Sequence, residues 1–118
     1  MSAPNLASSG ATVNGKTAHL AATNTEADLI AAIATGHCAR VEAVYAANIH
    51  ASVVGWVSLW HKAGGTEYHL ANQMTIPLNA TLNILDGRIL YLEEGDSLRV
   101  QANASSNVDV NAPYEDIS

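Results

Sequence analysis

The sequence predicts an all-β protein built as a single jelly-roll-like β-sandwich. Residues 76–117 contain short segments of alternating apolar and polar residues, separated by polar turns at regular spacing, which is typical of sandwiches and jelly rolls. Residues 41–48 and 54–61 add two further segments with a period of two. The length of 118 residues is enough for one domain with one core. We therefore expect one β-sandwich domain at residues 11–118.

Residues 1–10 (MSAPNLASSG) precede that domain and are small and polar. They predict an arm that becomes ordered only against a neighbouring surface. The β pattern begins at Ala11. Residues 12–22 hold Gly15 and Lys16 in their middle, so they predict either two short strands or one strand with a bulge.

Residues 23–36 (TNTEADLIAAIATG) are ambiguous in secondary structure. Thr25 and Asp28 have the spacing of a capping box, and Gly36 stands where a helix would end. Local propensity therefore favours a short helix near residues 25–35. The position of the segment between β segments argues instead for a strand followed by a loop.

The two central segments are more regular. Residues 41–48 have one strongly apolar face, and residues 54–61 are apolar on both faces, as expected for a strand in the middle of a sandwich. Gly64 and Gly65 predict a tight turn with positive backbone angles. Residues 67–71 then resume the alternation as the hairpin partner.

The back half gives the clearest strand pattern. Residues 81–86 and 88–92 are strand-like, and residues 93–96 (EEGD) form an acidic turn in which a glycine can adopt a left-handed conformation. Residues 98–103 and 108–115 alternate again, and the turn between them predicts a hairpin. Pro113 cannot donate a hydrogen bond to a ladder, so it predicts that the last strand lies at an edge or carries a bulge.

The charge pattern argues against two classes of partner. The net charge is −6, and the five basic residues are scattered along the chain, whereas a phosphate backbone requires clustered cations. We therefore expect no nucleic-acid binding. The most apolar stretch, residues 38–60, contains Arg40 and Glu42, so no membrane-spanning helix is expected. Residues 1–10 have neither the basic nor the apolar part of a secretory signal.

Side chains capable of catalysis or metal binding are present but scattered. Cys38 is the only cysteine, which excludes an intrachain disulfide and indicates a small buried side chain. The histidines lack the spacing of ligand pairs, although His61 and His69 could meet across a hairpin. The carboxylates of residues 93–96 could hold a calcium ion, but such turns are more often solvated. We expect no metal, no cofactor and no catalytic residues.

Trp56 and Trp60 are four residues apart and should lie on the same face of a strand. Tryptophans at such positions belong to a core or to a subunit contact more often than to a ligand site. The alternative is that the two rings stack on a sugar, which would make the chain a carbohydrate-binding module.

Several segments of the chain resemble one protein family. They are IPLNATLNIL (76–85), LYLEEGDSLRVQANASSNVDV (90–110) and YEDIS (114–118) in the back half, with VNGKTAHLAA (13–22) in the front. Together they are similar to small β-sandwich virion structural proteins of tailed bacteriophages. The entry into a strand at residues 36–41 also fits that family, and the resemblance covers nearly the whole chain.

The resemblance implies a capsid decoration, or cement, protein that binds the major capsid protein on the outer shell as a homotrimer. It implies a location on the capsid surface of the virion after synthesis in the host cytoplasm. Contacts to neighbours would involve Trp56 and Trp60, together with Pro4, Asn5 and Leu6 of the N-terminal arm.

Three other functions remain as alternatives. The chain could be a tail, neck or fibre component of low copy number, or a carbohydrate-binding module that uses Trp56 and Trp60. A jelly-roll enzyme would require His61 and His69 to converge with a carboxylate in a cleft.

Overall fold

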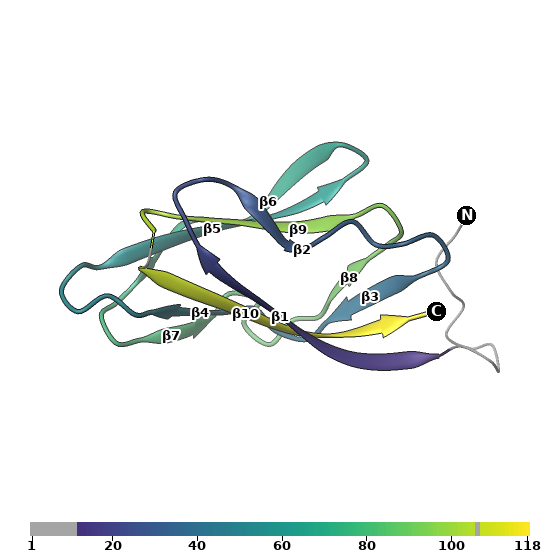
Figure 1. Cartoon of the computed structure of the whole chain (residues 1–118), viewed down its shortest axis with the longest axis horizontal. Helices are drawn as coiled ribbons and strands as arrows, with labels where there is room; N and C mark the ends of the chain where they lie inside the picture. The colour runs from purple at the N-terminus through teal and green to yellow at the C-terminus, as the bar shows by residue number, and fades with distance from the viewer. Residues whose placement is uncertain (1–11, 106) are drawn as a thin grey trace.

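The computed structural model describes residues 12–105 and 107–118 and shows an all-β protein (Figure 1). The predicted arm at residues 1–10 lies outside the described residues. Ten strands follow one another, and no helix occurs in the described part of the chain. The strands are β1 Val13–Ala22, β2 Ala27–Ile30, β3 Cys38–Val41, β4 Tyr45–Asn48, β5 Gly55–Ala63, β6 Thr66–Ile76, β7 Thr81–Asn83, β8 Leu90–Leu92, β9 Ser97–Ala102 and β10 Val108–Ile117.

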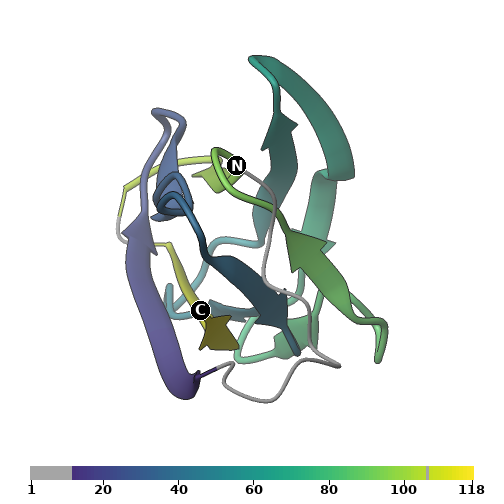
Figure 2. The same ribbon diagram turned by 90° about the vertical axis from the view of Figure 1, so that its right-hand side faces the viewer.

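The strands form two antiparallel sheets that face each other (Figures 1 and 2). The first, here called the β10 sheet, has β10 at its centre. Strand β1 pairs with β10 along its whole length, and β4 and β3 follow one another along the other side of β10. Strands β7 and β8 pair with β4 and β3. The second, here called the β5 sheet, has the order β2–β9–β5–β6.

The connectivity confirms the jelly-roll prediction. Because β3 and β4 lie end to end against β10, they act as one interrupted strand, and β8 and β7 continue the sheet in the same way. Counted so, the β10 sheet has the order β1–β10–β3/β4–β8/β7, and each sheet has four strands. Eight strands arranged in two such sheets, with repeated crossings between them, define a double-sheet jelly roll.

The core fills the space between the two sheets. Alternate residues in segments 98–102 of β9 and 108–112 of β10 are buried, which is why the period-two pattern was visible in the sequence. Each large apolar side chain that is fully buried contributes about 1.5–3 kcal/mol. The largest of them are Leu59, Ile76, Leu92, Leu98, Val41, Val44, Val57, Val100, Val108 and Val110.

The prediction of a short helix near residues 25–35 is wrong, and the alternative prediction of a strand followed by a loop is confirmed. Residues Ala27–Ile30 form β2, which pairs with β9 at the edge of the β5 sheet. Leu29 and Ile30 are both buried. Asp28 does not cap a helix; its carboxylate accepts a hydrogen bond from Arg99 at 3.0 Å. Burial of the apolar pair against the core therefore outweighs local helix propensity.

Two details of strand pairing also differ from the sequence prediction. Strands β9 and β10 belong to different sheets and do not form a hairpin, so the connection between them crosses the sandwich. Within residues 12–22 the structure has one strand, Val13–Ala22, which pairs with β10 in an unbroken register and has no bulge there. Alternation reveals which residues are strands, but it does not reveal which strand is the partner.

Pro113 lies in the central strand of the β10 sheet, so the prediction of an edge strand or a bulge is wrong. The Pro113 carbonyl accepts a hydrogen bond from the Glu42 amide at 3.0 Å. The nitrogen of a strand residue points to the same side as its carbonyl, and here that side faces the gap between β3 and β4. The N–H that Pro113 lacks would therefore have faced the gap between β3 and β4, where no strand residue is present to accept a hydrogen bond.

Candidate interaction surface

Trp56 and Trp60 lie on the same face of β5, as predicted from their spacing, and this is the outer face of the β5 sheet. The intervening residues Val57 and Leu59 point into the core and are fully buried. Both tryptophans are half-buried. Trp60 pairs across the hairpin with His69, and the centres of their rings are 5.2 Å apart with the planes tilted by 52°. The outer face therefore carries an aromatic pair at its middle.

A charged cluster lies beside this aromatic pair. Arg99 of β9 is the cross-strand neighbour of Trp60. Its guanidinium donates to the carboxylates of Glu26 at 2.6 Å and Asp28 at 3.0 Å. A hydrogen bond with Glu26 raises the pKa of Glu67, and burial adds to the shift. Arg99, Glu26 and Asp28 thus form a charged cluster next to Trp60.

The acidic turn at residues 93–96 forms hydrogen bonds to other parts of the fold. Gly95 has a φ of 84°, as predicted for a left-handed turn residue. Asp96 is buried, and its Oδ2 accepts hydrogen bonds from the Glu93 amide at 3.0 Å and from His61 Nε2 at 2.9 Å. The Asp96 carboxylate therefore connects the turn to β5 through His61.

The same turn fixes the segment that follows β2. The Ile33 amide donates to the Asp96 carbonyl at 2.9 Å, and the Ile33 carbonyl accepts from the Gly95 amide at 2.8 Å. The Gly36 amide donates to Glu94 Oε2 at 2.9 Å, and this hydrogen bond lowers the pKa of Glu94. Three hydrogen bonds therefore attach residues 33–36 to the turn.

His61 and His69, which a jelly-roll enzyme would need to bring together, lie on opposite faces of the β5 sheet. His61 binds Asp96 on the inner side of β5, whereas His69 lies against Trp60 on the outer side, so the two histidines do not converge. Within residues 12–105 and 107–118, no group of three or more His, Cys, Asp and Glu side chains could hold a metal ion. Burial raises the pKa of the Cys38 thiol, and Asp116 and Glu93 raise it further, which keeps the thiol protonated.

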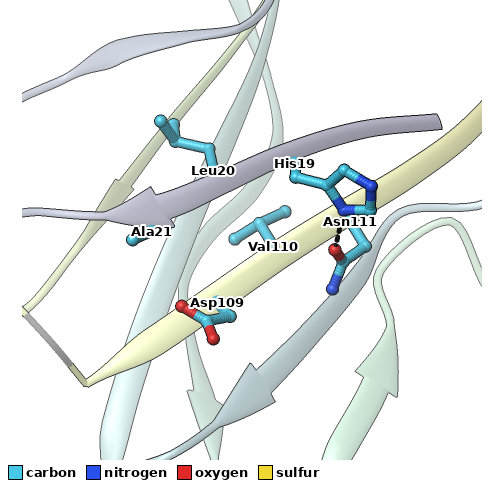
Figure 3. A pocket seen from close by; sticks show the side chains of 6 residues that line it. All are labelled: His19, Leu20, Ala21, Asp109, Val110 and Asn111. Carbon is cyan, nitrogen blue, oxygen red and sulfur yellow. Dashed lines mark hydrogen bonds between the residues drawn. The ribbon is translucent and has the colours of Figure 1, made fainter.

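A shallow hollow lies on the outer face of the β10 sheet (Figure 3). His19 of β1 and Asn111 of β10 point toward one another and form a hydrogen bond, and Asp109 lies two residues from Asn111 along β10. All the lining residues come from these two adjacent strands, so the hollow has no opposing wall. A ligand there would stay largely in water.

A second polar group lies near the C-terminal end of β10. Asp116 accepts hydrogen bonds from His37 Nδ1 at 2.9 Å and Lys16 Nζ at 3.2 Å. Burial by itself raises the pKa of Asp116, but the hydrogen bonds from His37 and Lys16 outweigh it and lower the pKa. The group links β1, β10 and the residue before β3.

Sequence reasoning located the tryptophans but missed the charged groups around them. Arg99 and Gln101 could have been placed on the outer face from the alternation of residues 97–102. Glu26, Asp28 and His69 could not, because their positions depend on which strands pair. Among the described residues, no helix is long and apolar enough to cross a membrane.

The protein is thus a jelly roll whose outer β5 face carries aromatic and charged side chains. Comparison with known proteins finds a distant structural likeness. No protein-family model and no curated protein matches the chain. Two crystal structures of a pentameric capsid protein isolated from metagenomic phage sequences are similar at 17% identity and a TM-score of 0.41, over 83% of this chain. This chain spans only 59% and 60% of those two chains. At this identity and TM-score, the likeness assigns neither a family nor a function.

Proposed function

We propose that this chain is a virion structural protein, specifically a decoration protein that binds the major capsid protein on the outer shell of a tailed bacteriophage and stabilises the head. The observation that carries the proposal is the resemblance of its sequence segments to small virion proteins of such phages. Those segments form the framework of the fold: residues 90–102 contain β8, the acidic turn and β9, and residues 114–118 end the central strand β10.

The surface of the protein is consistent with a binding role. The outer face of the β5 sheet presents Trp60 and His69 next to the cluster around Arg99. Aromatic and arginine side chains are enriched where proteins contact one another. We therefore assign Trp56 and Trp60 to a contact with a neighbouring subunit.

We further propose that the protein acts as a homotrimer and that Pro4, Asn5 and Leu6 of the arm contact a neighbouring subunit. Multivalent attachment would multiply contacts that are individually weak. Light scattering coupled to size-exclusion chromatography measures the number of copies, and a pentamer or monomer in solution would contradict the trimer. Deletion of residues 1–10 should weaken attachment to heads while the sandwich stays folded.

The decisive experiment measures binding and copy number together. Purified protein is mixed with heads assembled from the major capsid protein of the phage that encodes this chain, and bound protein is quantified after sedimentation. Mass spectrometry of intact virions gives the copy number in parallel. Saturable binding with many copies per particle is expected, whereas about a dozen copies or fewer would indicate a tail, neck or fibre component, because shell decoration is multivalent.

The Trp60–His69 pair also makes a carbohydrate-binding module a second candidate, since aromatic rings on an open sheet face can stack on sugars. Glycan-array binding that is lost in a folded Trp60→Ala variant would support this function. Tyr91→Ala is a suitable control, because Tyr91 is an exposed aromatic residue on a strand of the other sheet. The absence of glycan binding by the native protein would eliminate this candidate.

A further inference from the structure

Two neighbouring loops at one end of the sandwich contain no charged residue. The connection between β4 and β5, residues 49–54, and the connection between β6 and β7, residues 77–80, lie together at the left end in Figure 1. The backbone N–H of Asn48, the residue before the first loop, donates to the backbone carbonyl of Ala80 in the second loop at 3.0 Å. Neither loop contains Asp, Glu, Lys or Arg, although the chain has a net charge of −6. We call residues 49–54 and 77–80 the uncharged end.

The uncharged end exposes apolar side chains. Ile49 is 53% exposed, Val54 52%, Val53 41% and Leu78 38%. Together these four side chains present apolar surface on the order of 300 Å², which is the size at which patches on monomers are often functional.

The first of the two loops is held rigidly by side-chain hydrogen bonds. Asn48 is buried, and its Nδ2 donates to the Ile76 carbonyl at 2.9 Å and to the Val53 carbonyl at 3.1 Å. The Nδ1 atom of His50 accepts from the Ser52 and Val53 amides, both at 3.0 Å. An apolar loop whose backbone is fixed in this way loses little conformational entropy when it binds.

The second loop is a tight turn. The Ala80 amide donates to the Pro77 carbonyl at 3.2 Å, and Asn79 adopts a left-handed conformation with φ of 59°. Asparagine tolerates this conformation better than most residues. Leu78 is therefore presented to solvent at the corner of a fixed turn.

The size and charge of this end favour one kind of occupant. A patch of roughly 300 Å² is far below the roughly 800 Å² per partner that a stable pair of proteins buries, so two copies meeting end to end would not hold together by this contact. The absence of Lys and Arg makes a lipid surface a poor match. A narrow, rigid and uncharged protrusion instead fits a concave apolar pocket, where a weak contact is repeated over many copies.

We propose that the uncharged end docks into an apolar, uncharged pocket on the shell protein that this chain decorates. This inference rests on the proposed function and adds to it the part of the molecule that makes the contact. The outer face of the β5 sheet with Trp60 remains available for a neighbouring subunit.

The test places a charge in each loop separately. Val54→Asp and Leu78→Asp should each lower the affinity of the purified protein for heads of the encoding phage by at least about tenfold, because a carboxylate would be buried without a partner. The control is Ile89→Asp, which changes a 42% exposed side chain between β7 and β8. The control should bind within about twofold of the native protein, as is usual for surface changes outside a contact.

The outcomes separate the two proposals. If the native protein does not bind heads, the proposed decoration function fails and this inference fails with it. If the native protein binds and both loop variants bind equally well, the decoration function stands and the docking surface is wrong. Loss of the oligomer in the loop variants, or binding of the native protein to phosphatidylcholine vesicles, would likewise overturn the assignment to a shell pocket.

Discussion

Strands β9 and β6 both pair with β5, one on each side, yet the protein uses them differently. Leu98, Val100 and Ala102 of β9 are completely buried. Along β6 only Ile76, its last residue, is buried, and Tyr68 is 58% exposed. Hydrogen bonding to the same neighbour therefore does not decide the role of a strand; coverage by the opposite sheet does.

The pairing itself also differs between the two strands. The register between β5 and β9 is continuous from Val57 to Lys62, whereas the register between β5 and β6 shifts twice. Gln73 has a positive φ of 48°, and its amide donates to Ser58 Oγ at 2.9 Å. Irregular edges of this kind discourage pairing with strands of other molecules. Strand β6 can therefore expose side chains for binding while its edge resists extension of the sheet by a strand from another molecule.

The largest test of this contrast removes one leucine from each strand. Leu98→Ala in β9 should lower the free energy of unfolding by about 3 kcal/mol, because it creates a cavity between the sheets. Leu70→Ala in β6, where the side chain is 38% exposed, should change it by less than about 1 kcal/mol. Urea unfolding measures both values. Equal losses would show that pairing with β5, and not burial, determines the stability that each strand contributes.

A second test concerns close packing at the start of β5. A Cβ atom on Gly55 would lie 3.1 Å from Val108 Cγ2 and 3.2 Å from Asn103 Oδ1. Gly55→Ala should therefore destabilise the protein by about 1–3 kcal/mol through overpacking. Gly15→Ala in β1 is the matched control, because no atom lies within 4 Å of its added Cβ. A Gly55→Ala protein with native stability in urea would mean that the side chains of Val108 and Asn103 can move away without cost.

A third test varies the pH and concerns Asp116 of β10, the central strand of the other sheet. The lowered pKa of Asp116 means that its carboxylate stabilises the folded protein above the unfolded-state pKa of about 3.9, and that this contribution disappears as pH falls through the folded-state pKa. Asp116→Asn should cost about 1 kcal/mol at neutral pH. The difference from the native protein should shrink below about pH 4. A difference that stays constant across this range in pH-dependent unfolding would contradict the ion-pair explanation.

The smallest expected effect lies at the irregular edge itself. Gln73→Gly relieves a left-handed conformation worth roughly 1 kcal/mol, but adds freedom to the unfolded chain, so the net change in the free energy of unfolding should stay below about 1 kcal/mol. Thr75→Gly, two residues along the same strand, lacks the strain and should destabilise by about 1 kcal/mol. Thermal unfolding of both variants measures the difference. A larger loss for Gln73→Gly would show that the bulge depends on its side chain.

The sequence allowed the strands to be predicted but not all of their partners. Alternation identified β9 and β10 because residues 98–102 and 108–112 bury every second residue. It could not reveal that they lie in different sheets, since burial against either sheet gives the same pattern. Similarly, residues 27–30 are helical by local preference and become β2 only because β9 provides a pairing edge.

The candidate surface was predictable to a similar extent. The shared face of Trp56 and Trp60 followed directly from strand geometry. The attachment of His61 to Asp96 and of His69 to Trp60 required knowledge of which residues meet across the sheets. The uncharged end was visible in the sequence as a lack of charge, but its exposure depends on how its two loops are folded.

The position of β10 also determines when this protein can finish folding. Strand β10 pairs with β1, β3 and β4, and the pairing of Val13 with Ile117 connects residues about as far apart as the described chain allows. On the ribosome, the β10 sheet therefore has no centre until residues 108–117 have emerged. Contacts between such distant residues form slowly, and until they do, the core faces of β1 and β3 are exposed. The chain should therefore depend most on chaperones before residues 108–117 have paired with β1, β3 and β4.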